Sequence, residues 1–188
     1  MRPGRPLLAA CLLALVIGGG EVRAQAAVPT AAAAQGAQVP TAELRSQARA
    51  AALKRDWTAA LAGFDELVAR HGDDVDLLIE AARVHGFADR NARAAALYRR
   101  ALALAPARRA DIAPSLAWQS LWGGAPAEAR ALFAELAAAT SGAARVEMLD
   151  GLGQAHQAQG EQARALQAFG EAHALAPGQL RLHRRYAM

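Results

Sequence analysis

Small and large apolar residues recur in a fixed order along residues 41–179. In four stretches an alanine stands four residues before an aromatic residue. These pairs are Ala60 and Phe64, Ala94 and Tyr98, Ala129 and Phe133, and Ala165 and Phe169. Successive alanines of this set are separated by 34, 35 and 36 residues. A period of this length indicates a repeat array in which each repeat is one supersecondary unit.

The order of small and large residues has a physical reason. Two antiparallel helices approach closely only where one of them presents a small residue, as Ala82 and Ala94 do, and Tyr98 then fills the volume beside the crossing. Each helix pair leaves one apolar face uncovered, and the next pair covers it. Stability is therefore expected to come mainly from the interfaces between repeats.

The residues at fixed places resemble the tetratricopeptide repeat (TPR), a helix-turn-helix unit of about 34 residues. The second copy, counted from Val75, matches the family at Leu78, Ala81, Ala82, Ala94, Tyr98, Ala101 and Pro106. The fourth copy, counted from Val146, matches at Leu149, Leu152, Gly153, Gly160, Ala165, Phe169, Ala172 and Pro177. The first and third copies fit less closely, because Gly72 replaces the closing proline of the first and the third lacks one.

The resemblance implies an all-α fold, a right-handed α-solenoid of about four repeats over residues 41–74, 75–108, 110–143 and 146–179. Glycines at Gly123-Gly124 and Gly160 are expected to accept left-handed backbone conformations at turns. Helix caps are expected at Asp73 or Asp74, at Asp111 and at Ser141. Pro114 would then lie in the first turn of its helix, where proline is tolerated.

The first 24 residues are expected to be a secretory signal peptide rather than part of the fold. Arg2 and Arg5 precede an apolar run from Leu7 to Ile17, and small residues follow at a cleavage site before Gln25. The run is shorter than the about 20 residues of a membrane span, so no transmembrane anchor is expected after cleavage. Cys11 follows a lipobox-like Leu-Ala-Ala, but the apolar run continues beyond it, which argues against a lipoprotein.

The signal predicts a periplasmic or secreted protein, and its removal takes away the single cysteine. Residues 25–40 are rich in alanine and glutamine and are expected to form a flexible tether. Residues 180–188 are expected to cover the last repeat as a short cap. The run Arg181, His183, Arg184 and Arg185 is either the solvated face of that cap or a contact with anionic lipid or glycan.

The charge balance indicates no nucleic-acid partner. The formal net charge of +4 falls to about +2 once the signal is removed. A single lysine against many arginines raises the sequence pI to about 10.2 without implying a large electrostatic field.

In TPR proteins the surface usually used for binding is the concave face, which the first helix of each repeat lines. Carried over by repeat position, this resemblance selects Arg45, Arg49, Arg83, Phe87, Trp118, Trp122, Gln154 and Gln157 as candidate binding residues. Several of them are spaced four apart, as Arg83 and Phe87 are, and so lie on one helical face. The predicted groove runs from a basic end through an aromatic middle to an amide-rich end, which suits an extended ligand.

Other interpretations of these residues stay open. Because the third copy is out of register, either Trp118 or Trp122 could be turned into the core instead of toward a ligand. Trp57 is expected to pack between helices. His85 and His156 occupy equivalent places in two repeats and are expected to fill the helix pair.

The sequence offers little support for enzymatic chemistry. It contains no paired histidines at metal spacing and no phosphate-binding glycine loop after a strand, and the signal takes away its one cysteine. We therefore expect a non-enzyme without cofactor or metal. The resemblance implies an interaction module or assembly scaffold that binds a peptide or helix of another envelope protein. The alternative is a polysaccharide-contacting accessory subunit of an exopolysaccharide synthesis or export system, and a third is a bridge that uses the convex face.

Overall fold

The computed structural model describes residues 39–178, which consist almost entirely of helices. In chain order these are α1 (Thr41–Leu53), α2 (Trp57–Arg70), α3 (Val75–Phe87), α4 (Asn91–Leu104), the short 3₁₀ helix η2 (Pro106–Arg108), α5 (Arg109–Trp122), α6 (Pro126–Ala139), α7 (Gly142–Ala158) and α8 (Gln162–Leu175). The predicted signal peptide, most of the tether and the cap at 180–188 lie outside the described residues.

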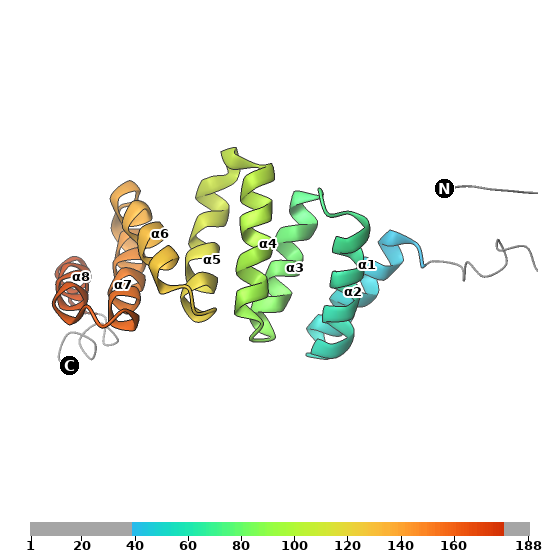
Figure 1. Cartoon of the computed structure of the whole chain (residues 1–188), viewed down its shortest axis with the longest axis horizontal. Helices are drawn as coiled ribbons and strands as arrows, with labels where there is room; N and C mark the ends of the chain where they lie inside the picture. Colours follow the sequence, from blue (N-terminus) through green and yellow to red (C-terminus); the bar gives the residue numbers. More distant parts are fainter. Residues whose placement is uncertain (1–38, 179–188) are drawn as a thin grey trace, which may run out of the picture. The chain divides into compact units, whose positions relative to one another are not determined.

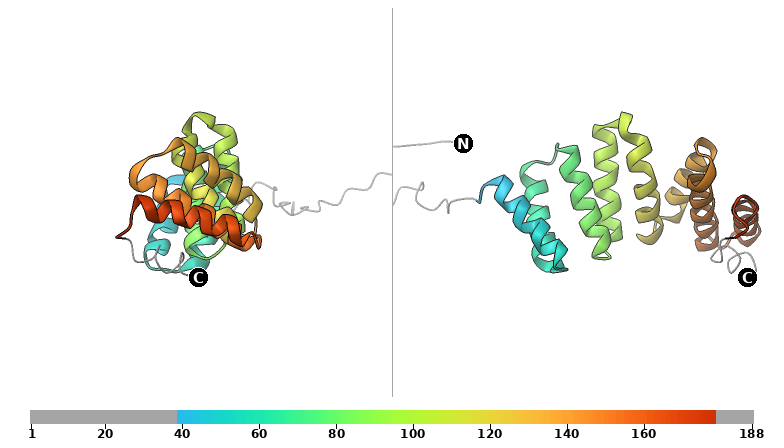
Figure 2. Two further views of the ribbon diagram at one scale, coloured as in Figure 1. Left: turned by 90° about the vertical axis from the view of Figure 1, so that its left-hand side faces the viewer. Right: turned by 180° about the vertical axis from the view of Figure 1, so that it is seen from behind.

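Each helix packs on the next one along the chain, and α5 also contacts α7. The helices consequently stand side by side in sequence order, with α1 at one end of the array and α8 at the other (Figures 1 and 2). No strand occurs between residues 39 and 178. The all-α solenoid of helix-turn-helix units is confirmed. None of the described helices is both long and apolar enough to span a membrane.

The alanine and aromatic pairs that define the repeat form the core. All four alanines and all four aromatic residues of the set are buried. The fit is tight because α7 presents glycines to these rings: a Cβ atom on Gly153 would overlap the ring of Phe169, and one on Gly151 would overlap Phe133. The predicted alternation of small and large residues is thus what brings the helices together.

In each repeat, one residue of the turn between the two helices has a left-handed backbone conformation. These residues are Arg55, Asp89, Gly124 and Gly160, with φ of 59°, 57°, 83° and 76°. They repeat at 34, 35 and 36 residues, the same intervals as the core alanines. The prediction is confirmed for Gly124 and Gly160, while the first two turns hold the same conformation with residues that carry side chains.

Helix starts agree with the sequence in part. The Asp74 carboxylate accepts a hydrogen bond from the Leu77 amide (3.0 Å) and caps α3, as predicted. Ser141 stands at the cap position of α7, but its side chain makes no capping hydrogen bond. The prediction for Asp111 is wrong: α5 begins earlier, at Arg109, so this residue lies within the first turn.

The third repeat differs most from the expectation. Because η2 leads directly into α5, Pro114 lies inside the helix, past the first turn in which it was predicted. Pro126, in contrast, is the first residue of α6, a place that suits proline. The next helix, α7, begins at Gly142, directly after the predicted cap position Ser141 and four residues before the repeat unit counted from Val146.

Candidate functional site

The predicted basic residues at the first repeat are joined to an acidic residue of the second. Arg45 and Arg49 of α1 both donate hydrogen bonds to Glu80 of α3, at 2.8 Å from the Arg45 Nε and 2.9 Å from the Arg49 Nη2. Burial would raise the pKa of Glu80, but the hydrogen bonds from Arg49 and Arg45 outweigh it and hold this pKa below its ordinary value. The positive charge at the basic end of the predicted groove is therefore partly balanced from within the protein.

A hollow of about 430 Å³ opens beside this ion pair, between α1, α2 and α3. It is lined by Arg49, Ala52, Leu53, Trp57, Phe64, Glu80, Arg83, Val84 and Phe87. Leu53 is 87% exposed and Phe87 72% exposed, which is high for side chains of this size. Trp57, which was expected to pack between helices, is half-buried and forms part of the wall. We call this cavity the α1–α3 hollow.

A second hollow of about 310 Å³ lies on the other side of α3 and is called the α3–α5 hollow. Its lining comprises Arg83, Gly86, Phe87, Tyr98, Ser115, Trp118, Gln119 and Trp122. Arg83 and Phe87 border both hollows, so the two cavities adjoin at the C-terminal half of α3. Together the two hollows are called the apolar groove.

The two tryptophans of α5 have different environments. Their rings stack with centroids 5.3 Å apart and an interplanar angle of 28°. Trp118 is half-buried and packs edge-on against Phe133 of α6, at 4.8 Å between centroids. Trp122 is 56% exposed at the end of the helix. The inner tryptophan therefore anchors the outer one, which faces the α3–α5 hollow.

Arg83 is the exposed cation at the boundary between the hollows. Its polar neighbour there is the hydroxyl of Tyr98. Burial raises the pKa of Tyr98, and the Ser115 side chain and the positive charge of Arg83 oppose this rise. Within residues 39–178 no carboxylate forms an ion pair with Arg83. Its charge is therefore available to a ligand.

The amides predicted to complete the groove lie apart from it. Gln154 and Gln157 are on α7, and neither lines the α1–α3 or the α3–α5 hollow. Gln154 donates a hydrogen bond to Asp150 on the same helix (3.2 Å). The structure thus gathers Arg49, Arg83, Phe87, Trp118 and Trp122 in one groove and leaves the amide end separate.

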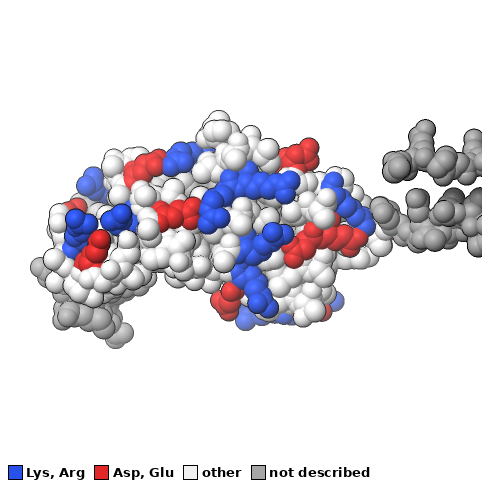
Figure 3. Space-filling view, viewed as in Figure 1, with Lys and Arg blue, Asp and Glu red and all other residues white. Residues whose placement is uncertain are grey.

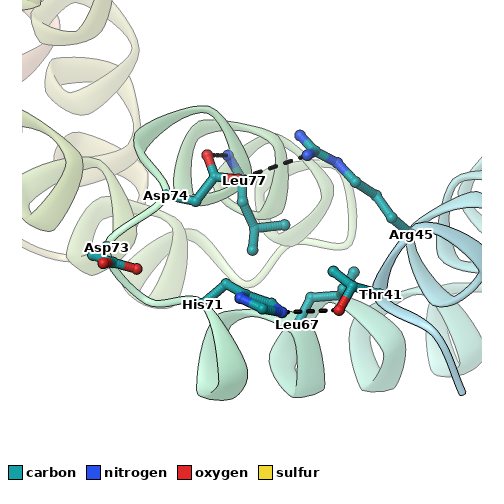
Figure 4. A pocket seen from close by; sticks show the side chains of 7 residues that line it. All are labelled: Thr41, Arg45, Leu67, His71, Asp73, Asp74 and Leu77. Atoms are coloured by element: carbon teal, nitrogen blue, oxygen red, sulfur yellow. Dashed lines mark hydrogen bonds and ion pairs between the residues drawn. The ribbon is translucent and has the colours of Figure 1, made fainter. Parts of the chain in front are cut away.

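A third hollow of about 360 Å³ lies between the first two repeats (Figure 4). The residues that line it are Thr41, Arg45, Leu67, His71, Asp73, Asp74 and Leu77. Thr41 and His71 are hydrogen-bonded through Oγ1 and Nε2 at 2.9 Å, and Arg45 pairs with Asp74 at 3.7 Å. Much of its polar chemistry is therefore used to join neighbouring helices.

Ion pairs also connect successive repeats away from the groove. Arg93 of α4 pairs with Asp65 of α2 at 2.9 Å, and Arg99 of α4 pairs with Glu128 of α6 at 2.7 Å. On the face shown in Figure 3 several basic side chains lie together over the middle of the array, and acidic side chains border them.

His85 and His156, the two histidines expected to fill helix pairs, each lie near a carboxylate that the sequence did not indicate. His85 is buried with its Nε2 atom 3.4 Å from Asp65, and His156 has its Nδ1 atom 2.5 Å from Glu161. Burial lowers the pKa of His85, and the Asp65 charge only partly opposes the shift. Across the described part of the chain, no three His, Cys, Asp or Glu residues gather as a metal site would require.

Comparisons with known proteins add evidence about the fold. No protein-family model matches the chain, and no curated protein matches it in sequence. Solved structures of MamA, a TPR-containing protein, do match in fold. A crystal structure of MamA has a TM-score of 0.65 and 14% identity over 78% of each chain. MamA from Desulfovibrio magneticus RS-1 has a TM-score of 0.64 and 17% identity, covering 78% of this chain and 81% of its own.

At these identities the similarity concerns the fold alone. The structural matches and the repeated helix pairs together define the chain as a TPR-like α-solenoid.

Sequence reasoning missed two residues of the candidate site. Glu80 accepts hydrogen bonds from both arginines of α1, and Leu53 is the most exposed large apolar residue described. The sequence did contain a signal for Leu53. Leu53 precedes Phe87 by 34 residues, and Phe87 precedes Trp122 by 35. Each of the three is an exposed apolar residue at the end of the first helix of its repeat.

Proposed function

We propose that the protein is a non-catalytic interaction module that binds an extended peptide or a helix of another protein in the apolar groove. The observation that carries this proposal is the shared lining of the two hollows. Arg49 and Arg83 border one hollow, and Arg83 borders the other together with Trp118. A ligand that crosses α3 would touch three successive repeats.

The exposed side chains of the groove provide a reason for a partner to bind. Leu53, Phe87 and Trp122 are all more than half exposed. A partner that buries a side chain of this type stabilises the complex by about 1.5–3 kcal/mol for each one. Trp122 is also held in place by its stack on Trp118, which reduces the entropy that binding would cost. Rigid aromatic anchors of this kind are typical of interface hot spots.

A polysaccharide ligand has less support. That alternative expects Gln154 and Gln157 to flank an exposed tryptophan platform. Trp122 is exposed, but neither glutamine borders the hollow in front of it. A peptide groove accounts for more of the observed geometry.

We further propose that the protein acts outside the cytoplasm, in the periplasm or as a secreted protein. The support is the sequence of residues 1–24, with its basic start, apolar run and small residues before Gln25. The mass of the protein recovered from the envelope of its source cells tests this. A mature chain that begins at Gln25 is expected, and an intact N-terminus on a cytoplasmic protein would contradict export.

Capture of partners from an envelope extract tests the binding proposal. The bait is the wild-type protein, compared with a Phe87→Ala, Trp122→Ala double variant that removes exposed side chains and leaves Trp118 in its packed position. A Leu104→Ala, Leu166→Ala double variant is the matched control, since both leucines are exposed and lie outside the groove.

A protein retained by the wild type and the control but lost by the groove variant supports the proposal. Retention of the same protein by all three would contradict it, and so would enrichment of glycan without any protein. Circular dichroism of each bait establishes that its helix content is unchanged.

A further inference from the structure

We propose that the groove selects peptide segments in which an acidic residue stands between two bulky apolar residues. This inference rests on the proposed function, because it names the chemistry of the ligand at the same site. Three features carry it: the division of the groove into two hollows, the position of Arg83, and the charges of the remaining chain.

The division of the groove suggests two apolar anchors in the ligand. The α1–α3 hollow and the α3–α5 hollow are separate cavities of about 430 and 310 Å³. Leu53, Val84 and Phe87 provide carbon surface in the first, and Phe87, Trp118 and Trp122 provide it in the second. Each cavity is large enough for one bulky side chain, and a segment that fills both must pass over Arg83 and Phe87.

The position of Arg83 suggests a carboxylate between those anchors. The other arginine that borders the groove, Arg49, is already bound to Glu80, whereas no carboxylate of residues 39–178 pairs with Arg83. A purely apolar ligand would cover this guanidinium without giving it a counter-charge, which is unfavourable. A carboxylate would instead form a charge-assisted, two-pronged hydrogen bond there, beside the Tyr98 hydroxyl.

The rest of the chain does not match this requirement. Residues 1–38 contain one carboxylate side chain, Glu21, and residues 179–188 contain none but have three arginines. A basic segment near Arg83 would be repelled. Charge complementarity therefore points to an acidic segment of another protein as the occupant.

Selection from a random-peptide phage-display library tests the inference, with the full-length chain immobilised as target. The wild type is compared with Arg83→Glu and with Arg100→Glu, the matched control, which makes the same charge change at an exposed α4 residue outside both hollows. The Phe87→Ala, Trp122→Ala variant identifies the peptides that bind in the groove.

The wild type and the Arg100→Glu control are expected to select Asp or Glu flanked by Leu, Phe or Trp. The Arg83→Glu variant is expected to select Lys or Arg at that place. A synthetic peptide of the wild-type consensus should bind about tenfold more weakly, or worse, to Arg83→Glu. Replacing its acidic residue by the corresponding amide should have a similar effect on the wild type.

Peptides that require Phe87 and Trp122 but show no acidic preference would overturn the inference and leave the proposed function intact. The absence of any groove-dependent peptide would contradict both. Binding of a uronic-acid oligosaccharide that depends on Arg83 and Trp122, with no peptide bound, would replace the peptide ligand by a glycan.

Discussion

Trp118 and Trp122 lie one helical turn apart on α5 and stack on each other, but only Trp118 also contacts the core, edge-on to Phe133. The inner ring thus belongs to the packing between α5 and α6, and the outer ring belongs to the surface. Stability and binding are expected to depend on different members of the pair.

Substitution of each tryptophan by alanine separates these roles. Trp118→Ala leaves a cavity against Phe133 and is expected to lower the free energy of unfolding by about 2–4 kcal/mol. Trp122→Ala removes an exposed ring and should lower it by less than about 1 kcal/mol. Urea denaturation of the two variants measures the difference, and equal losses would show that the outer ring is part of the core.

The contact between Gly153 and Phe169 predicts a strict size limit. A Cβ atom at residue 153 would overlap the Phe169 ring, which is itself fully buried and cannot move freely. Gly153→Ala should therefore cost about 1–3 kcal/mol of stability, although alanine favours helices. Gly178→Ala is the control, since a Cβ atom there meets no neighbour. A Gly153→Ala protein as stable as the wild type would refute the tight packing of α7 on α8.

The left-handed turn residues predict a stabilising substitution. Arg55 has φ of 59° where the fourth repeat has Gly160, so Arg55→Gly should relieve strain and raise the free energy of unfolding by up to about 1 kcal/mol. Gly160→Ala should lower it by about 1–2 kcal/mol for the same reason. Thermal denaturation monitored by circular dichroism compares the two. A destabilised Arg55→Gly variant would contradict the assigned turn conformation.

The ion pairs of Glu80 predict a dependence on pH. Despite the opposing effect of burial, hydrogen bonds from Arg49 and Arg45 lower the pKa of this group below its ordinary value of 4.5. Its stabilising contribution is therefore fully present above pH 4.5 and is lost as the pH falls through the lowered pKa. Because Arg49 is half exposed and screened by solvent, the contribution is expected to be only about 1 kcal/mol.

Glu80→Gln is the variant that isolates this contribution. Its free energy of unfolding should be lower than that of the wild type at neutral pH, and the two should converge in acid. Urea denaturation over a range of pH measures both values. A difference that persists unchanged in acid would mean that the side chain acts through packing and not through its charge.

Much of the fold followed from the sequence because repetition is a strong signal. The pairs of alanine and aromatic residues, such as Ala165 and Phe169, predicted the number of helix pairs and the core residues they share. The core alanines recur at intervals of 34–36 residues, which predicted one turn in each repeat. The turn residues with left-handed backbones recur at the same intervals. Local packing rules were sufficient for these features.

The candidate site was less predictable because it depends on how repeats stack. Glu80 reaches two arginines that precede it by 31 and 35 residues, a contact that only the arrangement of α1 beside α3 creates. The sequence left Trp118 and Trp122 undecided because the rotation of α5 depends on η2 and on the internal Pro114. Gln154 and Gln157 were selected as binding residues by their position in the repeat, but they do not border the apolar groove, which the preceding repeats form.

Photo-crosslinking from Phe87 in the source cells tests the central claim most directly. Benzoyl-phenylalanine replaces Phe87, which is 72% exposed and borders both hollows, and a control protein carries it at Leu166 on α8. The account predicts a crosslinked protein at Phe87 that is absent at Leu166 and is lost when Trp122→Ala is added. No crosslink at Phe87, or the same crosslinked protein from both positions, would contradict a peptide-binding groove at this site.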